Sequence, residues 1–397
     1  MALSLAVIII FGMAVNFLFT KMKLPGLLGM LLVGVIIGPY CLNWIDKSII
    51  NISSDIRKIA LMIILLRAGL GIKVKEIAKA GKTALFMSFI PGLFEGLAVS
   101  VASIWLLKLD FIRGGMLGFI LAAVSPAVVV PLMLKFIEEK KGLDKGIPIL
   151  ILSAASIDDV VAITCFTTFL GFYINGNINI GLQFLNIPIS IILGIVLGLV
   201  IGTILIWLFN KLHIRDTKKV ILILAVAIFM TELENVLADY IVIASLLGVM
   251  SLGFMITENK PELGERLSKK FSKLWLFAEL LLFVLVGAEV NIDVALHAGL
   301  KGLVVIVIGL VFRSLGVCLA TINSGLNIRE KLFVITSYIP KATVQAAIGS
   351  IPLMSGVQGG ELILAVAVLS IIFTAPLGSL LISITGEKVL SKSETFN

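Results

Sequence analysis

The sequence predicts an all-α integral membrane protein of about 13 transmembrane helices that contains inverted repeats. Three observations support this fold class. Hydrophobic residues make up 59% of the 397 residues, charged residues only 14%, and the mean hydropathy is +1.15. Apolar stretches of about 20 residues recur along the chain and leave no room for a separate soluble domain. The Lys and Arg residues are divided unequally between alternate loops.

Windowed hydropathy predicts thirteen spans joined by short loops. We expect the first to be a span and not a signal peptide, because no charged segment precedes it and no small-residue cleavage site follows it. The third is short, and the eighth is weak because Glu232 and Glu234 lie near its end. The spans cover approximately residues 2–20, 24–44, 57–72, 83–107, 113–136, 147–174, 187–210, 219–235, 240–257, 272–291, 299–322, 331–354 and 360–386.

The basic residues predict the orientation. Of the 32 Lys and Arg residues, 23 fall on one side of the predicted membrane and 6 on the other, while Arg67, Arg313 and Lys341 fall within spans. Because loops rich in Lys and Arg stay in the cytoplasm, we expect a multi-pass protein of the cell (inner) membrane. Its N-terminus would be outside and its C-terminus cytoplasmic.

Charge and cysteine content argue against other classes of protein. The net charge of +8 is spread over many short loops, which does not favour nucleic-acid binding. Cys41, Cys165 and Cys318 are widely separated within apolar runs, so neither a disulfide framework nor a cysteine metal site is expected.

Spans four to six and eleven to thirteen carry polar groups in the same order. Glu95 and Arg313 are 218 residues apart, and Pro126 and Pro340 are 214 residues apart. Since each unit has an odd number of spans, the second copy is inverted relative to the first. Proline-interrupted helices at matching positions of inverted repeats indicate the binding site of a transporter.

Two adjacent carboxylic acids, Asp158 and Asp159, lie inside the sixth span. A carboxylate near the bilayer centre is costly unless a partner, a cation or a proton compensates it. Successive side chains on a helix point about 100° apart, so the two acids cannot have the same role. One can face a fixed cation while the other faces an aqueous cavity and exchanges a metal ion for a proton. The alternative is that both are structural counter-ions.

Prolines predict a break in the fifth span and another in the twelfth. Pro126 and Pro131 each remove a backbone donor, so residues 124–131 are expected to unwind, and Ser125 would then offer oxygen to a cation. The alternative is a kinked helix without a ligand role. Pro340 predicts the second break.

Three more charged residues are expected near these breaks. Lys341 follows the second break, where it would balance the negative ends of half-helices, unless it extends to the interface instead. Glu95 and Arg313 occupy equivalent spans and carry opposite charges, so we expect them to pair, with Asp158 as a rival partner for the guanidinium. Since arginine keeps its proton, Arg313 would be a fixed counter-charge, or the pair would be purely architectural.

Other polar and small residues are secondary candidates. Glu289 is close to an outer span end and is expected to be solvated, whereas Glu279 is deeper and is either a pH sensor or structural. Arg67 faces other helices or the interface. A stripe of small residues in span seven suits close helix packing, and dimerisation is possible. It consists of Gly194, Gly198 and Gly202.

Four motifs in this order resemble a known family. They are Ala155–Val160 (ASIDDV), Ser125-Pro126, Phe312-Arg313 and Ile339–Ala347 (IPKATVQAA). Together they resemble the sodium/proton antiporters of the monovalent cation/proton antiporter superfamily, and within it the branch of animal NHA-type exchangers and their bacterial relatives. The likeness covers nearly the whole chain.

The resemblance implies a thirteen-helix protomer with two crossed discontinuous helices and elevator-like alternating access. The ion-binding core would comprise residues 83–174 and 299–386, and a dimerisation domain would comprise 1–72 and 187–257, with 272–291 linking them. Asp159 would be the principal cation- and proton-binding carboxylate and Asp158 its neighbour in the polar network. Glu95 would pair with Arg313, and Lys341 would balance the helix dipoles.

Two departures from the family pattern affect these expectations. Electrogenic members with paired aspartates have a lysine at the position of Arg313, and a lysine can release its proton whereas an arginine cannot. Two-proton exchange is therefore not expected. Some members also carry an acidic residue at the first break, where this chain has Ser125-Pro126.

We therefore expect a secondary antiporter that exchanges Na⁺ or Li⁺ for protons, electroneutrally, at Asp159. It would be a homodimer in membrane lipid, would not be an enzyme, and would need neither ATP nor a cofactor. Alternatives are a K⁺/H⁺ antiporter, a sodium-coupled symporter of organic anions, and a channel. An intramembrane aspartyl protease is not favoured, because it needs two acids on separate helices and a Gly-x-Gly-Asp motif, which the sequence lacks.

Overall fold

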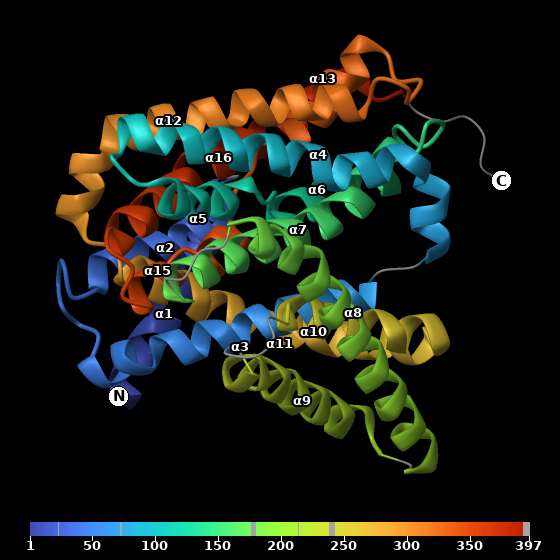
Figure 1. The fold of residues 1–397 in the computed structure, drawn as a ribbon, viewed down its shortest axis with the longest axis horizontal. Coiled ribbons are helices and arrows are strands. Elements are labelled where there is room, and N and C mark those ends of the chain that lie inside the picture. Colours follow the sequence, from blue (N-terminus) through green and yellow to red (C-terminus); the bar gives the residue numbers. More distant parts are fainter. Residues whose placement is uncertain (23, 72–73, 176–179, 213, 238–242, 392–397) are drawn as a thin grey trace.

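The chain folds into helices alone over the residues that the computed structural model describes, which are 1–22, 24–71, 74–175, 180–212, 214–237 and 243–391 (Figure 1). Apolar residues line most of these helices, as expected for segments that satisfy their backbone hydrogen bonds internally in lipid. The helices are α1 (Ala2–Lys21), α2 (Gly26–Ile37), α3 (Lys47–Gly71), α4 (Val74–Leu106), α5 (Phe111–Ala122), α6 (Pro126–Glu138), α7 (Ile147–Asn175), α8 (Ile180–Lys211), α9 (Asp216–Leu237), α10 (Ser245–Asn259), α11 (Pro261–Ala288), α12 (Ile292–Ala320), α13 (Ile328–Ser337), α14 (Thr343–Ile348), α15 (Ile351–Met354) and α16 (Gly360–Val389).

These helices follow the predicted spans in order, but the predicted number of spans is not confirmed. In the described residues, eight helices are long and apolar enough to cross a membrane. One of the eight is the α5–α6 pair taken together, and the apolar segments Gly26–Ile37 and Thr343–Met354 are shorter. The chain is thus a multi-pass membrane protein, and thirteen spans remain a prediction.

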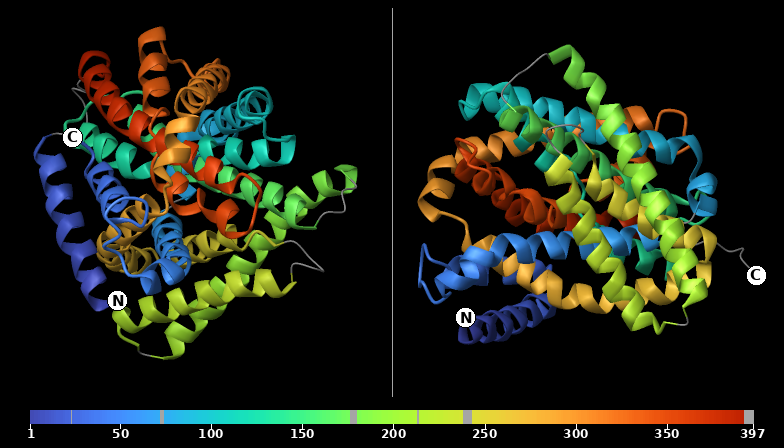
Figure 2. Two further views of the ribbon diagram at one scale, coloured as in Figure 1. Left: turned by 90° about the vertical axis from the view of Figure 1, so that its left-hand side faces the viewer. Right: turned by 60° about the horizontal axis from the view of Figure 1, so that its bottom comes forward.

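The helices pack in two groups. One contains α4–α7 and α12–α16, and the other contains α1–α3 and α8–α11. Figures 1 and 2 show α4, α12 and α16 on one side of the molecule and α3, α9 and α11 on the other. Contacts between the groups involve α14 with α3 and α11, α7 with α8 and α10, and α16 with α2. The predicted division into a core, a dimerisation domain and a linking helix remains a proposal.

The glycine stripe of α8 packs against α10 of the same chain. A Cβ on Gly194 would lie 2.3 Å from the Ala244 carbonyl oxygen, and one on Gly198 would lie 2.1 Å from that of Gly248. Such close backbone approach requires glycine at these positions. The close packing predicted from the stripe is therefore confirmed, and the partner is a helix of the same chain.

The two predicted helix breaks are present, but the first is shorter than expected. The helical segments α5 and α6 are separated only by residues 123–125, and α13 and α14 by residues 338–342. Pro126 occupies the first turn of α6, where its missing N–H leaves no hydrogen bond unmade. Pro131 lies inside α6 on its exposed face, so its prediction as part of the break is wrong. Its fixed φ suits a helix, which continues past it.

The helix that contains the third predicted span begins about three turns before that span. Hydropathy placed Arg57 at the start of the span, but α3 starts at Lys47. Arg57 is only 2% exposed. Its guanidinium binds both carboxylate oxygens of Glu289, at 2.7 and 2.8 Å, and the Ser350 hydroxyl at 2.6 Å. The expectation that Glu289 is simply solvated is wrong, because it is largely covered and pairs with the buried Arg57.

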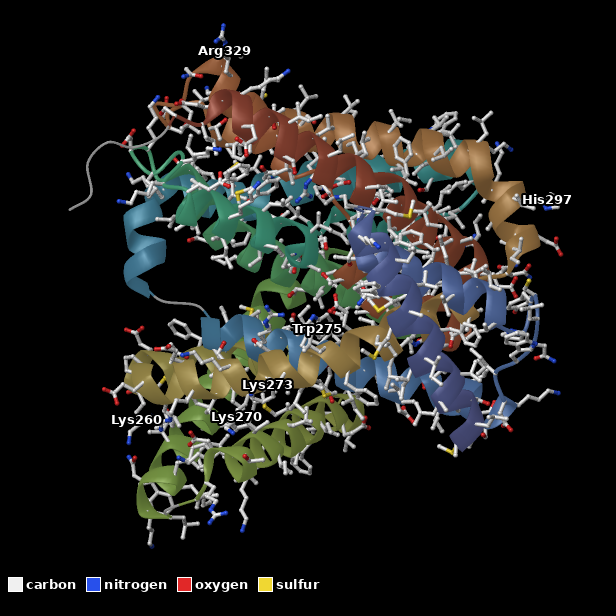
Figure 3. The ribbon with its side chains drawn as sticks, turned by 180° about the vertical axis from the view of Figure 1, so that it is seen from behind. Lys260, Lys270, Lys273, Trp275, His297 and Arg329 are labelled. Carbon is white, nitrogen blue, oxygen red and sulfur yellow. The ribbon has the colours of Figure 1, made fainter. Side chains whose placement is uncertain are left out.

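Basic residues predicted on the cytoplasmic side lie towards one end of the molecule. Figure 3 shows Lys260, Lys270 and Arg329 near one end and His297, from a predicted outer loop, at the opposite end. This separation along the helix direction is what the uneven distribution of Lys and Arg predicts for loops on opposite sides of a membrane.

Candidate functional site at two crossing helix breaks

The two helix breaks touch each other. The Ser125 backbone N–H donates to the Pro340 carbonyl oxygen over 2.8 Å. The Gln345 side-chain amide donates to the carbonyl oxygens of Ile120 and Ala123, each at 2.9 Å, and so caps the end of α5 from the other broken helix. The ends of four half-helices thereby meet in the interior of the protein, where their partial charges need compensation.

Arg313, on α12, binds both Glu95 and Asp158. One guanidinium nitrogen donates to Glu95 Oε2 over 2.7 Å and also to the Ala122 carbonyl oxygen, and the other donates to Asp158 Oδ2 over 2.6 Å. All three residues are 1% exposed. The Tyr338 ring lies beneath the guanidinium, with its centroid 5.0 Å from Cζ. Glu95 and Asp158, predicted as rivals for the guanidinium, therefore share it.

Lys341 lies within the second break and binds the same oxygen of Glu95 as Arg313 does. Its ammonium donates to Glu95 Oε2 over 2.6 Å, and the side chain is 1% exposed. Lys341 therefore does not extend to the membrane interface. A buried ammonium beside the ends of half-helices is in the position predicted for dipole compensation.

Asp158 also holds the first break in place. Its Oδ2 accepts the Val124 backbone N–H over 3.0 Å, in addition to the bond from Arg313. Both partners use the same oxygen, and Oδ1 has none among the described residues. Asp158 is thus tied to a fixed cation and to the backbone.

Among the described residues, no cation binds Asp159 directly. It is 9% exposed, and its buried Oδ1 has no hydrogen-bond partner among the described residues. The site contains three carboxylates, on Glu95, Asp158 and Asp159, and two cations, on Arg313 and Lys341. One negative charge is therefore left without a direct protein counter-charge, and a single monovalent cation or proton would neutralise it.

Several buried oxygen atoms around the breaks also lack partners in the described part of the chain. Such atoms are costly to bury, and oxygen is the ligand that hard cations take. They are Ser125 Oγ, the Tyr338 hydroxyl, Thr343 Oγ1 and Gln345 Oε1, besides Asp158 Oδ1 and Asp159 Oδ1. Oxygen ligands are therefore available on both breaks, and the chemistry suits a small dehydrated cation.

Sequence reasoning identified the charged residues of this site but not all of its polar ones. Tyr338, Thr343, Gln345 and Thr374 were not predicted as site residues. The first three flank Pro340, so their position next to a predicted break was a usable signal. Glu279 and Arg67 are half-buried on α11 and α3 and have no hydrogen bond to the charged residues of the site.

Crossed helix breaks with buried charges define a multi-pass membrane protein of the secondary-transporter class. The family model described as "Sodium/hydrogen exchanger, transmembrane" matches residues 5–388, and the chain belongs to this family.

Curated relatives agree with this assignment, and a solved structure has the same fold. The chain is 37% identical to sodium/hydrogen exchanger 9B2 of Mus musculus, over 94% of this chain and 70% of the relative. It is 36% identical to the Homo sapiens protein of that name, over 95% and 72%. The sodium proton antiporter MjNhaP1 from Methanocaldococcus jannaschii has the same fold, with a TM-score of 0.81, 20% identity and 96% of each chain covered.

Proposed function

We propose that this protein exchanges Na⁺ or Li⁺ for H⁺ across the membrane, and that cation and proton compete for Asp159. The observation that supports this most is the single carboxylate left over when Arg313 and Lys341 are paired with Glu95 and Asp158. Family membership and the names of the relatives point the same way. We further place the chain in the NHA-type branch, as a bacterial member.

In this proposal the buried charges have separate roles. Arg313 is a fixed counter-charge that keeps Asp158 ionised and holds the first break through it. Lys341 and Arg313 together neutralise Glu95 and offset the negative ends of the half-helices. Asp159 alone changes its occupant, and Ser125 on the neighbouring break adds an oxygen to the cation. Neither ATP nor a bound cofactor is required.

The proposed exchange is electroneutral. One cation or one proton occupies Asp159 in each half of the cycle, so the site carries the same net charge across the membrane in both directions. Arginine does not give up a proton under physiological conditions, so Arg313 contributes no second proton.

We propose an arrangement in the membrane consistent with this cycle. The core (83–174 and 299–386) moves in an elevator-like manner against a scaffold (1–72 and 187–257), with 272–291 as the linking helix. The N-terminus is outside, the C-terminus is in the cytoplasm, and two copies associate in the cell (inner) membrane.

Ion flux in proteoliposomes tests the proposed function. When vesicles loaded with Na⁺ are diluted into Na⁺-free buffer, the leaving Na⁺ should drive protons inward and acidify the lumen, as measured with an internal pH dye. Li⁺ should substitute for Na⁺. A membrane potential imposed with K⁺ and valinomycin should leave the initial rate unchanged.

Each alternative gives a different result in this assay. Absence of Na⁺-dependent acidification contradicts the proposal, and Na⁺ flux that requires an added organic anion favours a symporter. Equal exchange with K⁺ indicates a K⁺/H⁺ antiporter. A strong response to the imposed potential contradicts electroneutral exchange.

A further inference from the structure

The two helix breaks are held by equivalent hydrogen bonds in the two repeats. In the first, the Val124 backbone N–H donates to Asp158, which lies 34 residues later on α7, the third predicted span of its unit. In the second, the Lys341 backbone N–H donates over 2.9 Å to Thr374 Oγ1. Thr374 lies 33 residues later on α16, which is also the third predicted span of its unit. The inverted repeat thus pairs Thr374 with Asp158, as it pairs Arg313 with Glu95.

The buried hydroxyl of Thr374 both donates and accepts a hydrogen bond. Its side chain is 0% exposed. The hydroxyl donates to the Ser370 carbonyl oxygen over 2.7 Å, so its proton is engaged and a lone pair is free to accept the Lys341 N–H. A buried backbone N–H without a partner is costly, so removal of the hydroxyl leaves the break without its anchor at this residue.

Gly378, one turn later on α16, lets the same break pack closely against this helix, because glycine has no side chain. A Cβ on Gly378 would lie 2.4 Å from Cγ of Pro340. Since Thr374 and Gly378 are four residues apart, they lie on the same face of α16. One contact fixes the proline and the other the backbone of Lys341, whose ammonium reaches Glu95 only 2.6 Å away.

We propose that Thr374 is a positioning residue for ion exchange. Together with Gly378, it holds the second break against α16, so that the Lys341 ammonium stays in contact with Glu95. This inference rests on the proposed function, because its readout is cation–proton exchange. The uncharged Thr374 then anchors the break of the second repeat, as Asp158 anchors the break of the first.

The test compares Thr374→Val with Thr374→Ser. Valine removes the acceptor at nearly constant volume, and exchange should slow by about tenfold, as expected for one buried hydrogen bond. Serine keeps the acceptor and should retain exchange to within about twofold of the wild type. Thr385→Val is the matched control, because the hydroxyl of Thr385, on the same helix, hydrogen-bonds the Leu381 carbonyl oxygen and the Thr336 hydroxyl and does not hydrogen-bond Lys341.

A double-mutant cycle separates positioning from general destabilisation. In a Lys341→Met background, Thr374→Val should cause little further loss, because the ammonium that it positions is absent. Gly378→Ala should show the same phenotype and the same non-additivity, and it decides the question if Thr374→Val does not purify as a monodisperse protein. Additive losses, or equal rates for Thr374→Val and Thr385→Val, would overturn the inference. Absence of exchange by the wild-type protein would instead overturn the proposed function.

Discussion

Replacing Asp159 with asparagine is expected to reduce cation-driven proton flux to the leak of protein-free liposomes. Asparagine has nearly the same shape but binds neither a proton nor a cation by charge. Among the described residues, no cation binds Asp159 directly, unlike the other two acids of the site. The protein should still fold, because Asp159 Oδ1 has no hydrogen-bond partner to lose among the described residues. Flux is measured with an internal pH dye, and folding by gel filtration and thermal unfolding in detergent.

Glu279→Gln is the matched control for this prediction. It also neutralises a half-buried carboxylate in a membrane helix, but Glu279 has no hydrogen bond to the charged residues of the site. We expect flux near that of the wild type. Normal flux through the Asp159→Asn protein would refute the assignment of Asp159 as the exchanging site.

Replacing Arg313 with alanine is expected to have the largest effect on stability. The change leaves Asp158 buried without a cation and removes one of the two cations on Glu95. Removal of one partner from a buried ion pair costs about 3–5 kcal/mol. Arg313→Lys keeps the charge but not the fork that reaches both acids, so its loss should be smaller. Thermal and denaturant unfolding of the purified variants in detergent measure the difference.

Arg266→Ala controls for the loss of an arginine as such. Arg266 donates to Asp216 over 2.8 Å, a distance similar to that in the buried pairs, but its side chain is 53% exposed. An exposed pair contributes roughly 0–1 kcal/mol, so this variant should unfold close to the wild type. Equal destabilisation by the two alanine variants would show that burial does not determine how much the Arg313 ion pairs contribute to stability.

The sequence predicted those parts of the site that depend on charge and periodicity. Charged residues inside apolar spans are costly, so Glu95, Asp158, Arg313 and Lys341 had to find partners near one another. The helix repeat predicted different surroundings for Asp158 and Asp159. In the structure Asp158 binds Arg313, whereas no cation of the described residues binds Asp159 directly. Matching prolines located both breaks.

The features that the sequence did not predict depend on packing between distant segments. Arg57 was taken as a residue at the edge of a span, because hydropathy cannot detect that Glu289, 232 residues away, compensates it. Pro131 was taken as part of the break, although a proline on an exposed helix face is tolerated. The proposed role of Thr374 rests on the matching backbone hydrogen bonds at the two breaks, which depend on contacts between distant segments.

The central claim is that cation and proton compete for Asp159, and proton release on Na⁺ binding tests it most directly. The purified protein is titrated with Na⁺ in weakly buffered detergent solution at a pH where the site is protonated, and the released protons are recorded with a pH electrode or an indicator dye. We predict saturable release of about one proton per Na⁺ bound, as expected for a single exchanging carboxylate, and none from the Asp159→Asn protein. Na⁺ binding without proton release, or equal release from the Asp159→Asn protein, would contradict the account.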